Sequence, residues 1–282
     1  MSVVGPGVNA SAWASFLPNL AVQFLGTLAP NEGDGEAEAE VALGQNGMGS
    51  TFPAAAIFAD ASGFTALTEK LATLPDGAER MCSAINAFLT DMIDTVHKHG
   101  GDVVKFAGDA VSVVFPSGGD SEAMMRDAAV RATACAIELH QRVGGFVAWV
   151  DPADGVSYTL SLHIGVGVGT VTMLTLGGRS GRCELVFAGP PMIQSAAAEP
   201  RAQSNQTCLS PQAWALVADV AAGVEQPTDD GSADGAFVLV SSITVRLSGM
   251  GVGVGVGVGV GVGVSAGTSV GMGMGMGMGF RL

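Results

Sequence analysis

The sequence predicts a sheet protein of the α/β or α+β class, with helices packed on the faces of the sheet. Compact apolar runs, which are typical of buried strands, occupy residues 54–59 and 110–115. Longer segments at 79–99 and 121–144 carry apolar residues at helical spacing instead. A glycine pair at 100–101 separates a helix from a hairpin. Strands and helices that alternate in this way bury their apolar faces by stacking helices on a sheet.

Low-complexity segments restrict the folded part of the 282-residue chain to roughly one domain. Residues 1–45 form a lead-in segment that contains the acidic loop NEGDGEAEAE, and residues 46–222 form the main domain. A C-terminal extension follows at 223–248, and the tail at 249–282 consists mainly of Gly alternating with Val or Met. Glycine at every second place disfavours a helix, so we interpret the tail as flexible and prone to association rather than as a membrane span.

The charge balance excludes one class of partner and constrains another. The formal net charge is −14, with only 12 Lys and Arg residues, which argues against nucleic-acid binding through phosphate neutralisation. An acidic protein can still bind a nucleotide if divalent cations reverse the local field. The cysteines show neither zinc spacing nor a disulfide pattern, and no basic residue precedes Lys70, although a signal peptide requires one. We therefore expect a cytoplasmic protein with reduced thiols.

The elements can be justified in order along the chain. An apolar segment at 12–27 is too short to span a bilayer and is expected to pack on the domain. The strand at 54–59 ends at Asp60, and Ser62 precedes a helical pattern. After the helix at 79–99 we predict a hairpin formed by 102–105 and 110–115, with its turn at 107–109. The elements expected after the hairpin are a helix at 121–144, strands at 158–172 and 185–188, a helix at 192–199, and a strand with a short helix within 208–220.

Two aspartates stand in matching positions beside apolar strands. Asp60 ends the first strand, and Asp109 lies at the tip of the hairpin. If the strand of Asp60 is central and lies beside the hairpin, both carboxylates face one edge, where Mg²⁺ takes one or two carboxylates together with substrate phosphates. The backbone N–H groups of residues 62–65 would then bind a triphosphate. Asp also caps helices and forms turns, so the spacing alone leaves both interpretations open.

The motifs around these aspartates resemble those of a known family. FADASGFTALTEKLA at 58–72 and GGDVVKFAGDAVSVVF at 100–115 resemble the two metal-binding motifs of the class III nucleotidyl cyclases. The likeness is strongest to the first catalytic half of the bicarbonate-responsive soluble adenylyl cyclases, and it covers most of residues 15–215. The resemblance implies an α+β fold with a ferredoxin-like βαββαβ core and helices packed on its sheet.

The resemblance also implies an activity, that of an adenylate cyclase, which converts ATP to cyclic AMP and pyrophosphate. Asp60 and Asp109 would be the catalytic residues and, with the carbonyl group of Ala61, would hold two Mg²⁺ ions, which Mn²⁺ can replace. The triphosphate would lie on the backbone of the helix start, which comprises Ser62, Gly63, Phe64 and Thr65.

The chain departs from the family pattern on one side of the site. Sites in this family lie between two cyclase domains, and the second side supplies a transition-state Asn and Arg and a residue that reads the base. Aligned on Gly189, those positions hold Ile193, Ala197 and Val186. The resemblance therefore implies a catalytic half that is inactive as a homodimer and needs a complementary cyclase domain with the Asn and Arg. The alternative is a catalytically inactive module that binds metal–ATP or regulates a partner cyclase domain.

Lys105 has two interpretations within this family. In symmetric cyclases a lysine at this place recognises adenine. In the first half of the soluble enzymes it lies in a degenerate pseudo-site and helps to hold bicarbonate with an arginine. That arginine falls at Ala196 here, and Arg201 is the nearest alternative. Lys105 therefore has two candidate ligands, bicarbonate as an effector and the base of the nucleotide.

Two further features are interpreted as structural. His163 lies in an apolar strand, where a core histidine is a better interpretation than a ligand. The run GVGVG at 165–169 lacks the helix that follows a dinucleotide-binding loop, so we predict a strand with small residues there.

Overall fold

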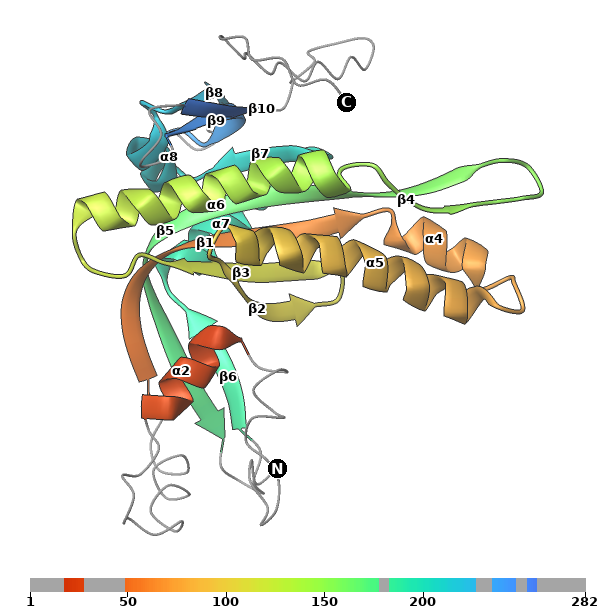
Figure 1. The fold of residues 1–282 in the computed structure, drawn as a ribbon, viewed down its shortest axis with the longest axis horizontal. Coiled ribbons are helices and arrows are strands. Elements are labelled where there is room, and N and C mark those ends of the chain that lie inside the picture. The colour runs from red at the N-terminus through yellow and green to blue at the C-terminus, as the bar shows by residue number, and fades with distance from the viewer. Residues whose placement is uncertain (1–17, 28–48, 178–182, 227–234, 247–252, 258–282) are drawn as a thin grey trace, which may run out of the picture.

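Figure 1 shows the protein as a computed structural model, which describes residues 18–27, 49–177, 183–226, 235–246 and 253–257. Its helices are α2 (Asn19–Thr27), α4 (Phe64–Leu71), α5 (Gly77–Lys98), α6 (Glu122–Val143), α7 (Pro190–Ala198) and α8 (Pro211–Val217), with a 3₁₀ turn, η2, at Glu199–Arg201. Its strands are β1 (Gly49–Ser62), β2 (Asp102–Ala107), β3 (Ala110–Pro116), β4 (Phe146–Val150), β5 (Ser157–Gly177), β6 (Cys183–Ala188), β7 (Gln206–Leu209), β8 (Ala221–Glu225), β9 (Val238–Arg246) and β10 (Gly253–Gly257).

The strands form one sheet in the order β10-β9-β7-β5-β1-β3-β2, with β4 and β6 paired to β5 and β8 paired to β9. Its centre, β5-β1-β3-β2, is antiparallel throughout. Helices α4 and α5 connect β1 to β2, and α6 lies between β3 and the β4–β5 hairpin. This connectivity is a ferredoxin-like βαββαβ core, so the predicted fold is confirmed. As a result β1 is a central strand, flanked by the β2–β3 hairpin and by β5.

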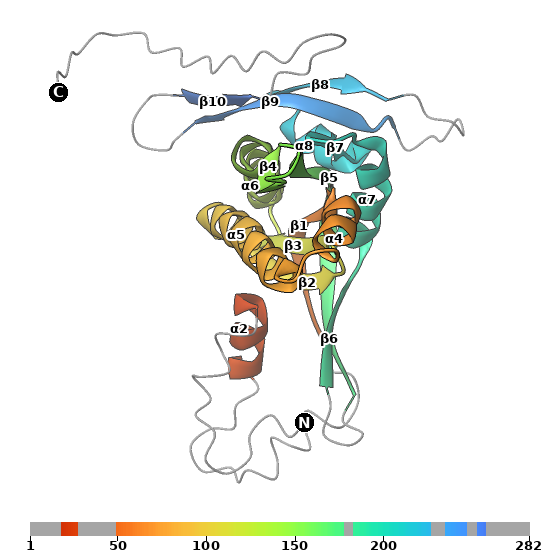
Figure 2. The same ribbon diagram turned by 90° about the vertical axis from the view of Figure 1, so that its right-hand side faces the viewer.

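The two faces of the sheet carry different layers. Figure 2 shows α5 and α6 on one side of the central strands and α7 on the other. The first side holds the main core, in which Ile57 and Ala59 of β1 belong to the same buried cluster as Phe88 and Ile137. Because side chains alternate along a strand, Asp60 lies on the opposite face, the face that α7 partly covers. The α7 face is therefore the one that can carry a site.

Glycines in β5 allow α7 to lie directly on the sheet. A Cβ atom added to Gly165 would lie 1.9 Å from the carbonyl oxygen of Ser195, and one added to Gly167 would lie 2.4 Å from that of Pro191. The prediction of a strand with small residues at 165–169 is thus confirmed. The side chain of Gln194 fixes the helix further, because its Oε1 accepts hydrogen bonds from the Val168 N–H and the Ser210 hydroxyl, each over 2.9 Å.

Helix α2, the part of the lead-in segment that the structure describes, packs on the domain, as predicted. In α2, the backbone N–H of Leu20 donates to Asp102 Oδ2 over 2.7 Å, and Ala21 is buried. The side chain of Leu20 packs against a small cluster that includes Val114. Among the helices that the structure describes, none is long and apolar enough to cross a bilayer.

The sequence-based prediction missed strands β4, β8 and β9. The first is the apolar run FVAWV, and the third is rich in β-branched residues, so both carry ordinary strand signals. Strand β9 pairs with β7 and β8, so the sheet continues beyond residue 222, which was expected to end the main domain. Within the tail, Gly253–Gly257 forms β10 on the edge of β9, so the expectation of a flexible tail is wrong for this segment. The rest of the tail lies outside the described residues.

A buried histidine gives the fold a defined pH dependence. His140 of α6 is buried, its Nε2 lies 2.8 Å from the Thr207 hydroxyl, and burial lowers its pKa from 6.5 to about 4. Below pH 6.5 this histidine becomes protonated in the unfolded chain but stays neutral in the folded protein. The free energy of unfolding therefore falls as the pH falls toward 4. We expect this group to remove about 3 kcal/mol of unfolding free energy across that window.

Urea unfolding at several pH values between 7 and 4 measures this effect. His140→Gln should flatten the dependence of stability on pH, whereas His97→Gln, at an exposed position of α5, should leave it unchanged. Equal slopes for His140→Gln and the unmodified protein would contradict the assignment.

Candidate active site

Asp60 occupies a central place in the sheet, near the C-terminal end of β1. Its neighbours across the strands are Ala110 of β3 and His163 of β5, both in antiparallel register. The residue is half-buried. The long apolar run that precedes it holds β1 between two strands, so the position of the carboxylate is set by sheet pairing rather than by a loop.

Asp109 lies in the tight turn of the β2–β3 hairpin, directly after Gly108, whose φ is 68°. This turn lies against β1, because the Ala61 N–H donates to the carbonyl oxygen of Asp109 over 3.3 Å. The predicted arrangement, a central strand with Asp60 beside the hairpin, is confirmed. The three residues expected at a metal site are thus brought together at one place on the sheet.

The charge of Asp109 also acts on Asp60. Burial raises the pKa of Asp60 most, the negative charge of Asp109 raises it further, and His163 lowers it. Ionisation of Asp60 is thus disfavoured in the fold unless a cation compensates the charge. Within the described ranges, no group of three His, Cys, Asp or Glu side chains could hold a metal ion. Two carboxylates and a carbonyl group fit a cation that takes its remaining ligands from substrate phosphates and water, as Mg²⁺ does.

The start of α4 follows β1 immediately and is built on glycine. Gly63, the N-cap residue, has φ 101°, and a Cβ atom there would lie 2.2 Å from the Thr159 carbonyl oxygen. The first N–H groups of a helix have no partner within it, and here no side chain caps them either. The Ser62 hydroxyl lies 2.7 Å from that of Ser161. The ring of Phe64 packs edge-on against the ring of Phe88, with 6.0 Å between the ring centroids. The backbone of residues 62–65, rather than these two side chains, is what the segment offers to an anion.

The interpretation of His163 as a core histidine is wrong. Its side chain is 26% exposed, it lies opposite Asp60, and its Nδ1 is 3.7 Å from Glu199 Oε1. Burial, followed by the charge of Asp60, raises the pKa of Glu199. Sequence reasoning did not identify Glu199, since only the pairing of β5 with β1 and the packing of α7 bring it near. Strand periodicity could have placed His163, because it shares its face with Ser161 and Gly165.

Lys105 lies on the same face of the sheet as Asp60 but to one side of it. It pairs with Ser112, which in turn pairs with Phe58, and β3 separates its strand from β1. The residue is exposed. A role in a second pocket stays a prediction for this lysine.

Arg201, the alternative partner for bicarbonate, is engaged elsewhere. Its Nη1 donates to the Ala197 carbonyl oxygen over 2.5 Å, and its guanidinium carbon lies 4.0 Å from the centroid of the Phe237 ring. Such a cation–π contact stabilises the arginine on η2. Binding of bicarbonate between Lys105 and Arg201 would therefore require that Arg201 leave both contacts.

Helix α7 presents an apolar surface where the family pattern has hydrogen-bond donors. Gly189 precedes the helix with φ 129°, and a Cβ atom there would lie 2.3 Å from the Thr170 carbonyl oxygen, which fixes the start of the helix. Ile193, at the position of the Asn, is 71% exposed, and Ala197, at the position of the Arg, is half-buried. Neither side chain can donate a hydrogen bond to a phosphoryl group.

Comparison with known proteins identifies the family. Residues 49–211 match a model of the adenylate and guanylate cyclase catalytic domain. The chain belongs to this family, the class III nucleotidyl cyclases. The sequence-based recognition is thus confirmed, on a match that covers the strands and helices around Asp60 and Asp109.

The cyclase domain is also similar in sequence to curated proteins. It is 30% identical over 168 residues to adenylate cyclase type 10 of Mus musculus, a match that covers 58% of this chain and 10% of the mouse protein. The chain thus spans about a tenth of the length of the curated relatives that it matches.

Solved structures confirm the fold. The adenylyl cyclase CyaB of P. aeruginosa aligns with a TM-score of 0.54 at 22% identity, over 72% of this chain and 100% of that one. The guanylyl cyclase Cya2 aligns with a TM-score of 0.50 at 22% identity, over 68% of this chain and 92% of that one. Since cyclases of both kinds share the fold, the architecture alone does not choose between ATP and GTP.

Proposed function

We propose that this domain is one catalytic half of an adenylyl cyclase, which converts ATP to cyclic AMP and pyrophosphate. The observation that carries the proposal is the juxtaposition of Asp60 and Asp109, on β1 and on the adjacent hairpin turn, in a chain of the cyclase family. The relatives that are named adenylate cyclases support ATP as the substrate.

Each part of the site has a task in this reaction. Asp60, Asp109 and the Ala61 carbonyl group would hold two Mg²⁺ or Mn²⁺ ions, which when bound neutralise phosphate charge and acidify the attacking hydroxyl group. The backbone N–H groups at residues 62–65 bind and orient the triphosphate. The ribose 3′-oxygen attacks the α-phosphorus as its proton leaves, and the bond from this phosphorus to the pyrophosphate oxygen breaks.

The domain alone supplies only part of this machinery. Ile193 and Ala197 leave α7 without the donors that stabilise charge on the phosphoryl oxygens, so a second cyclase domain must provide an Asn and an Arg. The same observation supports a second candidate function, a catalytically inactive module that binds metal–ATP or regulates a partner cyclase domain.

Reconstitution with a complementary domain separates these two functions. We expect cyclic AMP formation with Mg²⁺ or Mn²⁺ only when a second domain that carries the Asn and Arg is added, with a rise of about 100-fold or more over either domain alone. A complementary domain that lacks this Asn and Arg serves as the control. Calorimetry that detects metal–ATP binding without turnover under any pairing would favour the inactive module, and absence of both would refute the proposal.

A further inference from the structure

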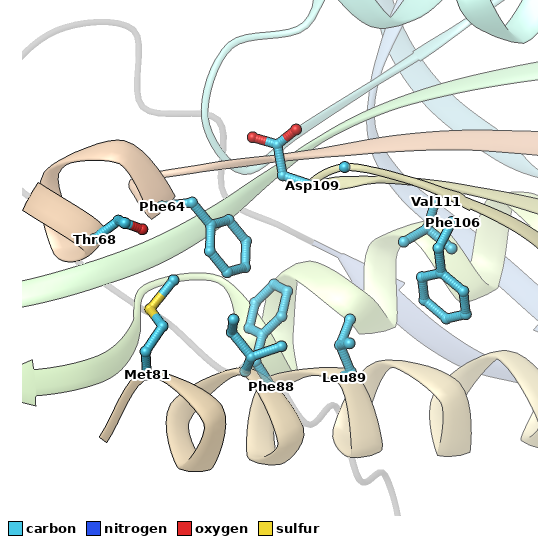
Figure 3. A pocket seen from close by; sticks show the side chains of 10 residues that line it. Phe64, Thr68, Met81, Phe88, Leu89, Phe106, Asp109 and Val111 are labelled. Atoms are coloured by element: carbon cyan, nitrogen blue, oxygen red, sulfur yellow. The ribbon is translucent and has the colours of Figure 1, made fainter. Parts of the chain in front are cut away.

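A cavity of about 360 Å³ lies behind the Gly108–Asp109 turn, between α4, α5 and the β2–β3 hairpin (Figure 3). Apolar side chains from all three elements line it: Phe64, Met81, Ile85, Leu89, Phe106 and Val111. The cavity is open to solvent on one side, so it is a surface pocket rather than an interior void. Small-molecule sites begin at roughly 300 Å³, so the volume suits one small ligand.

The floor of the cavity is buried, and its mouth is accessible. Phe88 is fully buried and makes edge-on contacts with Phe64 and Phe146, at centroid distances of 6.0 and 5.7 Å. Phe106, by contrast, is 49% exposed on the hairpin arm. A large apolar side chain that remains half in water is a favourable contact for an entering molecule.

The polar groups of the cavity define the class of ligand. Thr68 supplies a hydroxyl group, and Asp109 is the one charged residue in the lining. Figure 3 shows the Asp109 carboxylate turned away from the aromatic rings. An anion would find no cationic partner in this lining and would approach a carboxylate at its edge, which is unfavourable. An uncharged apolar molecule needs no such partner.

We propose that this cavity, the hairpin pocket, binds a small uncharged apolar molecule with an aromatic or branched body and at most one hydrogen-bonding group, placed toward Thr68. The molecule would contact Phe64, which belongs to the proposed phosphate-binding segment, and Gly108, which precedes the proposed metal ligand Asp109. By filling the space between α5 and the hairpin, it would restrict the turn and change the affinity for Mg²⁺–ATP. This second part rests on the proposed function.

Binding of the neutral fluorophore prodan tests the pocket without any use of enzyme activity. We expect saturable binding to the full chain, at least about tenfold tighter than that of the anionic naphthalene dye ANS. Met81→Trp, which fills the pocket, should weaken prodan binding by about tenfold or more. Val224→Trp, at an exposed position of β8 outside the pocket, should leave it unchanged.

Circular dichroism and thermal unfolding establish that each variant folds. If Met81→Trp does not fold, Phe106→Ala at the exposed mouth takes its place, and it should weaken prodan binding because one wall is lost. Equal prodan affinity in the folded pocket variant and the unmodified protein overturns the proposal, and so does the absence of saturable binding.

The regulatory part is separated by measuring Mg²⁺–ATP affinity by calorimetry, with and without saturating prodan. We expect a change of about threefold or more, which Met81→Trp should abolish. Prodan binding with unchanged Mg²⁺–ATP affinity would refute the coupling and leave the pocket standing. Failure of the proposed function, in contrast, would appear as retained cyclase activity after loss of Asp109, which prodan binding does not report.

Discussion

Asp60→Asn and Asp109→Asn are each expected to reduce cyclic AMP formation by about 100-fold or more when the domain is paired with a complementary half. Each substitution removes one of the two carboxylates at this place on the sheet, where the charge of Asp109 raises the pKa of Asp60. A loss of roughly 3 kcal/mol of transition-state stabilisation corresponds to this factor. The measurement is the rate of cyclic AMP formation at saturating ATP with Mg²⁺ and, separately, with Mn²⁺.

Stability measurements distinguish this effect from unfolding. Because the pKa of Asp60 is raised by burial and by Asp109, the ionised carboxylate opposes folding at neutral pH. Asp60→Asn should therefore unfold at the same temperature as the unmodified protein or at a higher one. Asp94→Asn, at an exposed position of α5, is the matched control and should retain full activity. Activity that survives the loss of either Asp60 or Asp109 would exclude the proposed metal site.

The second large effect is a gain of activity. Ile193→Asn combined with Ala197→Arg should give the domain its own transition-state donors, so that two identical copies form cyclic AMP without a complementary domain. We expect a rise of about 100-fold over the unmodified domain alone. Ile193 is 71% exposed, so its replacement by a polar residue should cost little stability.

The rate should rise with protein concentration, since the site then depends on association of two copies. Adding Asp60→Asn to the double variant should abolish the gained activity, which shows that both sets of groups act in one site. Val224→Asn combined with Ala222→Arg, on β8 away from α7, serves as the control and should gain nothing. A double variant that folds and dimerises but stays inactive would show that further groups are missing from this chain.

Local signals in the sequence determined most of the secondary structure, and the resemblance of two motifs to a known family predicted that the two aspartates lie together. The β2–β3 hairpin could be predicted because apolar arms surround a Gly-Asp turn, and α5 because one of its faces is apolar along its length. Helices α4 and α5 separate the hairpin from the strand of Asp60, so local signals alone did not determine that β1 pairs with β3. Recognition of the family rested on the same two motifs and was confirmed.

Strands at the periphery were less evident, although their residues carried ordinary signals. Strand β4 is short, and β9 lies within the residues that were assigned to a C-terminal extension, so neither was joined to the sheet. Strand β9 is part of the domain because it pairs with β7. Strand β7 in turn pairs with β5, which lies earlier in the chain. Periodicity describes the residues within one strand and carries no information about its neighbours.

Only the tertiary structure decided what surrounds Asp60. His163 lies beside it because β5 pairs with β1 in one particular register. Glu199 lies near His163 because glycines in β5 let α7 lie on the sheet. The hairpin pocket likewise exists because α5 and the hairpin leave space that no side chain fills. Local propensity acts over a few residues, whereas register and packing are set by the burial of surfaces from distant segments, and these determine the environment of a site.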